Sequence, residues 1–170
     1  MKLSDAPGTS ASVQINAPAA TVFAIVSDLN TPAQSSSEFR GAQWLDGAEP
    51  GVGARFRGRN EHPAIGAWET IGEVTDFEPD RVFRYAIPNE GGLPPGAIWG
   101  YEIEEGDGSV LLTQSVQIGP GPSGISKAIE QMPEKEERIL QRRLQEHSAN
   151  IEANLQTIKR LAEAEAGRTS

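Results

Sequence analysis

The stretch that decides the fold is PEKEERILQRRLQEHSANIEANLQTIKRLAEAE, residues 133–165. Apolar residues recur along it at steps of three and four, which is the period of one face of an α-helix. They are Leu140, Leu144, Ile151, Leu155, Ile158 and Ala162. Pro133 suits the first position of a helix, and acidic residues follow it where the helix dipole favours negative charge. The stretch therefore predicts one long helix with one buried face.

One polar residue, His147, falls in line with this apolar stripe, between Leu144 and Ile151. A histidine beside a cavity that titrates near neutral pH can move protons in an aldol or dehydration step. The alternative is a neutral, hydrogen-bonded histidine of the core, or one that reaches solvent at the edge of a sheet. Both interpretations stay open at this point. The other histidine, His62, is far away in the sequence and adjoins Pro63 near a predicted hairpin end.

The chain ahead of this helix predicts an antiparallel sheet. Val13 and Ile15 alternate with polar residues in a first strand, and Ala17-Pro18 and Thr31-Pro32 then open two short helices. Alternation with a period of two, broken by turn residues, continues to Ile118. The predicted strands span residues 10–16, 39–46, 54–62, 68–77, 81–88, 97–105 and 109–118.

These elements predict an α+β fold, in which the long helix covers the apolar face of an antiparallel sheet of about seven strands. We expect a flexible N-terminus at residues 1–9, a single domain at residues 10–166 and a frayed tail at residues 167–170. A short amphipathic piece after the loop at Gly119 to Gly124 predicts a lip or lid.

Composition excludes several classes of function. The 170 residues contain no cysteine, which rules out thiolate metal sites, and the two histidines show no ligand spacing. The net charge of −9 opposes binding to nucleic acid. Residues 1–10 lack a signal-peptide core and no apolar run is long enough to insert into a membrane, so we expect a cytoplasmic protein. The glycine clusters fit neither phosphate-loop nor dinucleotide spacing. We expect neither a metal nor another cofactor, and a metal site built from carboxylates is the alternative that stays open without support from the sequence.

The strand pattern turns several polar residues toward the helix, and this predicts a cavity. Asn60, His62, Thr70, Tyr85, Tyr101 and Gln114 share the inward face with apolar residues, although a shift of register would turn His62 outward. Each buried polar group without a partner costs about 1–3 kcal/mol, so this set must pair internally, hold water or line a cavity. We also expect Gly58 and Gly72 to leave gaps beside them. Arg55, Arg57 and Arg59 face the other way, with Glu69 and Glu73 across from them.

The candidate binding residues combine the inward strand positions with the helix stripe. They are Phe56, Asn60, Trp68, Thr70, Phe83, Tyr85, Trp99, Tyr101, Gln114, Leu140, Leu144, His147 and Ile151. The candidates for acid–base chemistry are His147, Tyr101 and Tyr85. Taken singly, each inward tyrosine or threonine can instead bond to the backbone, and each aromatic residue can simply pack.

The order of short motifs along the chain resembles the START-like, birch-pollen-allergen-like helix-grip superfamily (SRPBCC). These motifs are Val13-x-Ile15-x-Ala17-Pro18, Val22-Phe23, Asp28, Val52-Gly53-Ala54-x-Phe56-x-Gly58-x-Asn60, Trp68-x-Thr70, Val74, Glu78-Pro79, Phe83 and Trp99-x-Tyr101. Within it the chain is most similar to the polyketide cyclase/dehydrase and lipid-transport group. The resemblance implies a curved sheet around the helix and a hydrophobic cavity between them.

Members of this group bind polyketides, sterols, lipids, hormones or quinones, and some catalyse ring closure and dehydration without a cofactor. The leading hypothesis is therefore binding of a small hydrophobic molecule, polyketide-, lipid- or sterol-like, by a monomer or homodimer. The second is an aromatase or cyclase that folds a poly-β-ketone. The third is a protein-interaction module, because co-chaperone-like relatives share the fold.

Overall fold

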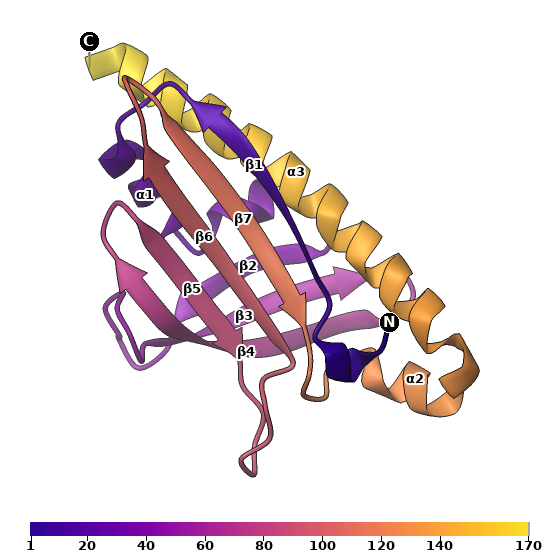
Figure 1. The fold of residues 1–170 in the computed structure, drawn as a ribbon. Helices are drawn as coiled ribbons and strands as arrows, with labels where there is room; N and C mark the ends of the chain where they lie inside the picture. Colours follow the sequence, from indigo (N-terminus) through magenta and orange to yellow (C-terminus); the bar gives the residue numbers. More distant parts are fainter. Residues whose placement is uncertain (170) are drawn as a thin grey trace.

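A long helix lies diagonally across a curved, seven-stranded antiparallel sheet (Figure 1). The computed structural model describes residues 1–169. Strand order across the sheet is β1-β7-β6-β5-β4-β3-β2, with every neighbouring pair antiparallel. The strands are β1 (Gly8–Ile15), β2 (Phe39–Trp44), β3 (Arg55–His62), β4 (Gly66–Glu78), β5 (Val82–Ile87), β6 (Ala97–Glu105) and β7 (Val110–Ile118). The predicted α+β helix-grip architecture is confirmed.

The connection from β1 to β2 crosses from one edge of the sheet to the other. It contains helix α1 (Ala19–Val26) and the 3-10 turn η2 (Thr31–Gln34). Pro18 is not the first helical residue as predicted, because its backbone is extended and it caps the N-terminus of α1. The second short helix is likewise only this 3-10 turn, and the Thr31 hydroxyl donates to the Ile25 carbonyl oxygen at 2.8 Å.

The C-terminal helix α3 runs from Glu136 to Thr169. Pro133 opens a separate 3-10 turn, η3 (Pro133–Lys135), so the α-helix starts three residues later than predicted. A short helix, α2 (Ser126–Gln131), precedes this turn at the predicted amphipathic piece. The tail expected to fray at residues 167–170 continues α3 as far as Thr169, and Ser170 lies outside the described residues.

The N-terminal residues expected to be flexible lie against the start of α3. Leu3–Asp5 forms the 3-10 turn η1, and the Leu3 amide donates a hydrogen bond to the Glu136 carboxylate at 2.8 Å. Strand β1 begins at Gly8, two residues earlier than predicted.

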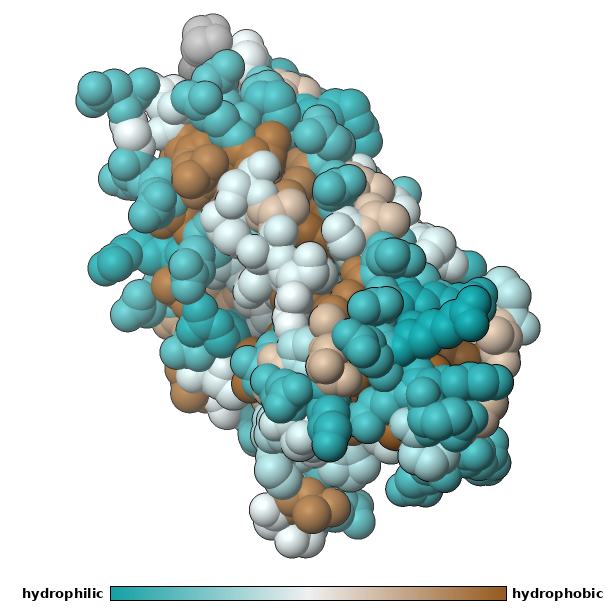
Figure 2. All heavy atoms as spheres, turned by 45° about the vertical axis from the view of Figure 1, so that its right-hand side comes forward, coloured by the Kyte–Doolittle hydropathy of each residue, from teal (hydrophilic) through white to brown (hydrophobic). Residues whose placement is uncertain are grey.

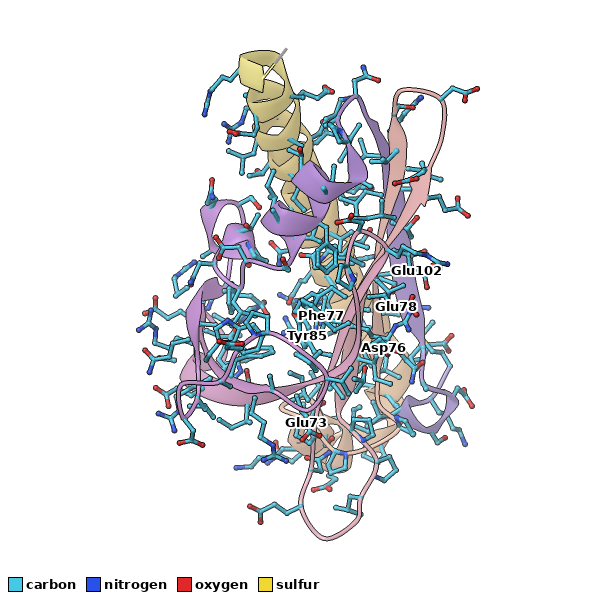
Figure 3. The ribbon with its side chains drawn as sticks, turned by 90° about the vertical axis from the view of Figure 1, so that its left-hand side faces the viewer. Glu73, Asp76, Phe77, Glu78, Tyr85 and Glu102 are labelled. Atoms are coloured by element: carbon cyan, nitrogen blue, oxygen red, sulfur yellow. The ribbon has the colours of Figure 1, made fainter. Side chains whose placement is uncertain are left out.

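A bulge in β4 changes which face its last residues occupy. The pairing with β5 shifts between Val74 and Asp76, so the inward positions pass from Val74 to Phe77. Phe77 makes edge-to-face contacts with Phe23 of α1 and Phe83 of β5. Figure 3 shows Phe77 and Tyr85 on the concave side, whereas Asp76 and Glu102 lie on the other side of the strands.

The core fills only one end of the space between α3 and the sheet. Here α3 packs on β1, β7 and α1, and fully buried side chains such as Ile15, Val22, Leu112, Leu155 and Ile158 form one cluster. The outer faces of α3 and α2 are mostly hydrophilic (Figure 2). Within residues 1–169, no helix has the combination of length and apolar composition required to cross a membrane.

Candidate functional site

The other end of the space between α3 and the concave face of the sheet is a cavity of about 510 Å³. That volume lies in the range of roughly 300–1,000 Å³ found for small-molecule sites. Strands β3 to β7 supply one wall, and α3 supplies the opposite wall through Arg143, His147, Asn150, Ile151 and Asn154. The rim comes from the β3–β4 hairpin, the β5–β6 loop and the loop before α2.

All predicted binding residues except Leu140 and Leu144 line this cavity. Strand register explains the grouping, because residues directly opposite each other in neighbouring strands share a face of the sheet. Two rows of such pairs cross the middle of the sheet: Phe77–Phe83–Tyr101–Gln114 and Val74–Tyr85–Trp99–Val116.

The prediction that Leu140 and Leu144 belong to the cavity wall is wrong. Leu140 is fully buried, but it lies about 10 Å of helix before His147 and outside both the cavity and the main core cluster. Leu144 is only half-buried. At 100° per residue, the cavity-facing side of α3 is turned by roughly 60° from the centre of its apolar stripe. The stripe faces the core, and a mixed polar face beside it meets the cavity.

The gaps expected beside Gly58 and Gly72 are filled by aromatic rings. A Cβ atom at Gly72 would lie 2.2 Å from the Phe56 ring, so this ring rests directly on the Gly72 backbone. A Cβ atom at Gly58 would meet Phe39 at 3.3 Å and Thr70 at 3.4 Å. Glycine at these positions lets the rings of Phe56 and Phe39 approach the backbone closely and shape the cavity wall.

A buried hydrogen-bond bridge joins α3 to the sheet at the core end of the cavity. The Nδ2 group of Asn154 donates to the Tyr101 hydroxyl oxygen and to Oε1 of Gln114, each at 2.9 Å. Tyr101 and Gln114 are cross-strand partners on β6 and β7, which is why one amide reaches both. Because Asn154 donates to its oxygen, the Tyr101 hydroxyl keeps its own hydrogen to donate.

Both cavity tyrosines stay protonated well above neutral pH. Burial raises the pKa of Tyr85, and the nearby Tyr101 hydroxyl raises it further. Burial also raises the pKa of Tyr101, although the hydrogen bond from Asn154 partly offsets the effect. Among residues 1–169, no group hydrogen-bonds to the Tyr85 hydroxyl, and no acceptor receives the Tyr101 hydroxyl hydrogen. The cavity therefore contains two uncharged phenol donors.

His147 faces the cavity as a neutral imidazole. Its ring packs edge-on against Trp99, with ring centroids 4.9 Å apart, and its side chain is 8% exposed. Burial and the adjacent Arg143 cation lower its pKa from 6.5 to about 3, while Glu38 opposes the shift. Of the two interpretations left open by the sequence, this low pKa favours the neutral histidine over one that titrates near neutral pH. Within the described chain its ring nitrogens have no hydrogen-bond partner, in contrast to the alternative of a satisfied core histidine.

An ion-pair cluster lies at the mouth of the cavity. The Arg143 guanidinium donates to both Glu38 oxygens at 2.7 and 2.8 Å, and to Glu146 at 2.8 Å. His62 Nδ1 accepts a hydrogen bond from the Ala64 amide, so Nε2 carries the hydrogen and donates to Glu146 at 3.2 Å. The cluster ties the β3–β4 hairpin and the segment before β2 to α3.

The surroundings of Glu38 and Arg143 favour the ionised forms of both side chains. Burial opposes ionisation of Glu38, but the hydrogen bonds and charge of Arg143 outweigh it and hold the pKa of Glu38 below its usual range. Burial also opposes the charge of Arg143, yet Glu38 and Glu146 together raise its pKa. The mouth therefore carries a fixed, internally paired set of charges.

Glu38, His62 and Glu146 are the described residues closest to a metal-ligand arrangement, with potential ligand atoms within 4.8 Å of one another. The guanidinium of Arg143 already lies between the two carboxylates and supplies the positive charge that a metal ion would bring. The group therefore fits an ion-pair network better than a metal centre.

The rim is held together by its own hydrogen bonds. The Asn89 amide donates to the carbonyl oxygens of Pro94 and Pro122, each at 2.9 Å, and so joins the β5–β6 loop to the loop before α2. Asn150 accepts hydrogen bonds from the backbone amide and hydroxyl of Ser37 at 2.9 and 3.1 Å.

Of the polar residues that α3 turns toward the cavity, sequence reasoning found His147 but missed Arg143, Asn150 and Asn154. Arg143, His147, Asn150 and Asn154 recur at steps of four, three and four, a second helical line beside the apolar one. That spacing could have identified them. Glu38 gave no such signal, because it lies in an irregular segment between η2 and β2.

The curved sheet, the long helix and the cavity between them define a helix-grip protein. The sequence matches the family described as polyketide cyclase / dehydrase and lipid transport over residues 7–163. The chain belongs to this family, and the resemblance seen in the sequence is confirmed. No curated protein matches the chain.

One solved structure supports the same grouping, and two more share the fold. The Polyketide_cyc-like protein Cgl2372 from Corynebacterium glutamicum is 30% identical, with a TM-score of 0.64, and the match covers 97% of this chain and 94% of that one. The di-domain ARO/CYC StfQ from the steffimycin biosynthetic pathway has a TM-score of 0.69 at 16% identity, and the match covers 94% of this chain and 52% of StfQ. Ara h 8.0201 has a TM-score of 0.56 at 12% identity, with coverage of 89% and 97%. The similarity to StfQ and to Ara h 8.0201 is a similarity of fold alone.

Proposed function

We propose that this protein binds a small hydrophobic molecule in the cavity between α3 and the sheet. The observation that carries the proposal is the cavity of about 510 Å³, whose aromatic wall also presents hydrogen-bonding groups without protein partners. An apolar wall with a few oriented polar groups is typical of sites for small organic ligands.

The unpaired groups favour a ligand over simple packing. The Tyr85 hydroxyl and the His147 ring nitrogens line the cavity without a hydrogen-bond partner in residues 1–169. Leaving such a group unpaired costs about 1–3 kcal/mol, which a ligand or bound water removes. The membership of the family and the size of the cavity support ligand binding over a protein-interaction module.

Uptake of a neutral fluorescent probe tests the proposal. Nile red should bind saturably to the wild-type protein with an increase in fluorescence, and native mass spectrometry should detect a bound molecule after gentle purification. Thr70→Phe places a large ring in the cavity wall and should weaken Nile red binding by about tenfold or more. Thr113→Phe is the matched control, because Thr113 lies on the convex face of β7.

The two variants decide whether the probe occupies the cavity. Equal binding by wild type and Thr70→Phe would place the probe elsewhere on the surface. Absence of both saturable uptake and a co-purified molecule would refute the proposal.

A cofactor-independent cyclase or dehydratase is the second candidate. The observation that favours it is that Tyr85, Tyr101 and His147 converge on one cavity, where two protonated phenols can hydrogen-bond to an enolising carbonyl oxygen. Orientation of a flexible substrate in a shaped cavity supplies much of the rate in such reactions. Turnover of a poly-β-ketone that fell on Tyr85→Phe and Tyr101→Phe substitution would support it, and unchanged turnover would exclude these roles. A cytoplasmic location and a monomeric or homodimeric state remain parts of the proposal.

A further inference from the structure

We infer that Glu38 makes the cavity selective for neutral ligands: it neutralises the charge of Arg143, so that carboxylates are excluded while a carbonyl oxygen binds to the phenols of Tyr85 and Tyr101. This inference rests on the proposed function and specifies its ligand class.

The charges around the cavity oppose an anion. Within the described residues 1–169, Arg143 is the only lysine or arginine that lines it, and Glu38 is the only buried carboxylate among the lining residues, because Asp28 and Glu69 are exposed and Glu69 pairs with Arg57. The charge of Arg143 is already paired, since its guanidinium binds both oxygens of Glu38 and one oxygen of Glu146. A ligand carboxylate would therefore lose its hydration without gaining a cation.

The Glu38–Arg143 pair is well placed to hold this arrangement. The two side chains are only 9% and 14% exposed, and their contact is bidentate, which is the strongest geometry for a guanidinium and a carboxylate. Glu38 comes from the segment before β2, whereas Arg143 and Glu146 come from α3. The pairing thus forms only when the fold brings these segments together at the mouth.

The far end of the cavity offers donors rather than charges. Tyr101 receives a hydrogen bond from Asn154 and so directs its own hydrogen elsewhere, and the Tyr85 hydroxyl has no protein partner in the described chain. Burial keeps both groups protonated. Uncharged donors in an apolar pocket bind a ketone, quinone or ester oxygen without the cost of burying a charge.

Four ligands with the same ring skeleton separate the effect of a carbonyl acceptor on affinity from the effect of a negative charge. Fluorene and 9-fluorenone differ by a carbonyl oxygen at one carbon, and methyl fluorene-9-carboxylate and fluorene-9-carboxylate differ by a negative charge. Their affinities are measured by displacement of Nile red at neutral pH. We expect wild type to prefer fluorenone over fluorene by about threefold to tenfold, and the ester over the carboxylate by about tenfold or more.

Two substitutions test the residues. Glu38→Gln keeps the shape of the side chain but removes its charge, so it should narrow the gap between ester and carboxylate by about tenfold. Tyr85→Phe should reduce the preference for fluorenone over fluorene toward one. Circular dichroism and thermal unfolding confirm that each variant is folded.

The outcomes distinguish the two proposals. Equal binding of ester and carboxylate by wild type would overturn the inference while ligand binding stands, and this comparison needs no variant. An unchanged gap in folded Glu38→Gln would overturn the role of Glu38. Failure of Nile red and all four compounds to bind would overturn both.

Discussion

The amide of Asn154 on α3 donates a hydrogen bond to the hydroxyl oxygen of Tyr101 on β6 at 2.9 Å, joining helix and sheet where the core gives way to the cavity. The same amide also donates to Gln114, so two buried polar residues, one on β6 and one on β7, depend on the side chain of Asn154. Such a bridge holds α3 at a fixed distance from the sheet, because a shift or rotation of α3 would break its hydrogen bonds.

Asn154→Ala should therefore destabilise the protein by about 2–4 kcal/mol, since it removes two hydrogen bonds and leaves Oε1 of Gln114 buried without a partner. Urea unfolding measures this loss. A double-mutant cycle with Tyr101→Phe should give a coupling free energy of about 0.5–1.5 kcal/mol. Strict additivity of the two substitutions would contradict the bridge.

The buried ion pair of Arg143 and Glu38 should contribute far more to the free energy of unfolding than the ion pairs on the convex face do. Arg143→Ala leaves the Glu38 carboxylate buried without its cation, which typically costs about 3–5 kcal/mol. Arg55→Ala is the matched control, because Arg55 and Glu73 are 3.1 Å apart but largely solvent-exposed, and such pairs contribute about 1 kcal/mol or less. Unfolding free energies in urea compare the two. Similar losses of unfolding free energy in both variants would mean that burial does not determine how much the Arg143–Glu38 pair stabilises the protein.

Much of the cavity wall could be predicted because strand side chains alternate with a period of two. Once Phe56 and Tyr101 are placed inward, Asn60, Trp68, Thr70 and the rest follow from parity and pairing. The outward position of Arg55, Arg57 and Arg59 follows in the same way. In the structure Arg55 pairs with Glu73, and Arg57 pairs with Glu69.

What could not be predicted depends on contacts between distant segments. The helix has a cavity-facing side turned away from its apolar stripe, so a search for apolar residues selects Leu140 and Leu144 and passes over Asn154. The neutral state of His147 depends first on its burial against Trp99 of β6, a contact that exists only in the folded chain, and then on the nearby Arg143 cation. The β4 bulge that brings Phe77 into the core likewise has no signal in the alternation.

His147 should make the protein less stable as pH falls from 7 to 5. The native state holds it neutral down to about pH 3, whereas the unfolded chain protonates it below about 6.5. Protons therefore bind the unfolded state more strongly in this window, and stability is lost by about 1.4 kcal/mol for each pH unit below about 6.5.

Substitution of this histidine should flatten the profile. His147→Gln should remove about 2 kcal/mol of the difference in unfolding free energy between pH 7 and pH 5. The lowered pKa of Glu38 acts in the same direction only below its ordinary value of 4.5, outside this window. His62→Gln is the control for the second histidine. A wild-type profile that is flat over this range, or one that His147→Gln leaves unchanged, would show that His147 does not stay neutral.

Gly72 supports the cavity wall by giving the Phe56 ring a surface to rest on. In Gly72→Ala the new methyl group would lie 2.2 Å from the ring, which must then move toward the cavity. We expect a loss of about 1–3 kcal/mol of stability from overpacking, together with weaker Nile red binding because the ring enters the ligand space. Gly58→Ala is the milder counterpart, since its methyl group would meet Phe39 and Thr70 at 3.3 and 3.4 Å.

The decisive variant is Gly72→Ala combined with Phe56→Leu, in which the smaller side chain makes room for the methyl group. If the double variant regains neither stability nor Nile red binding relative to Gly72→Ala alone, the contact between Phe56 and Gly72 does not shape the cavity.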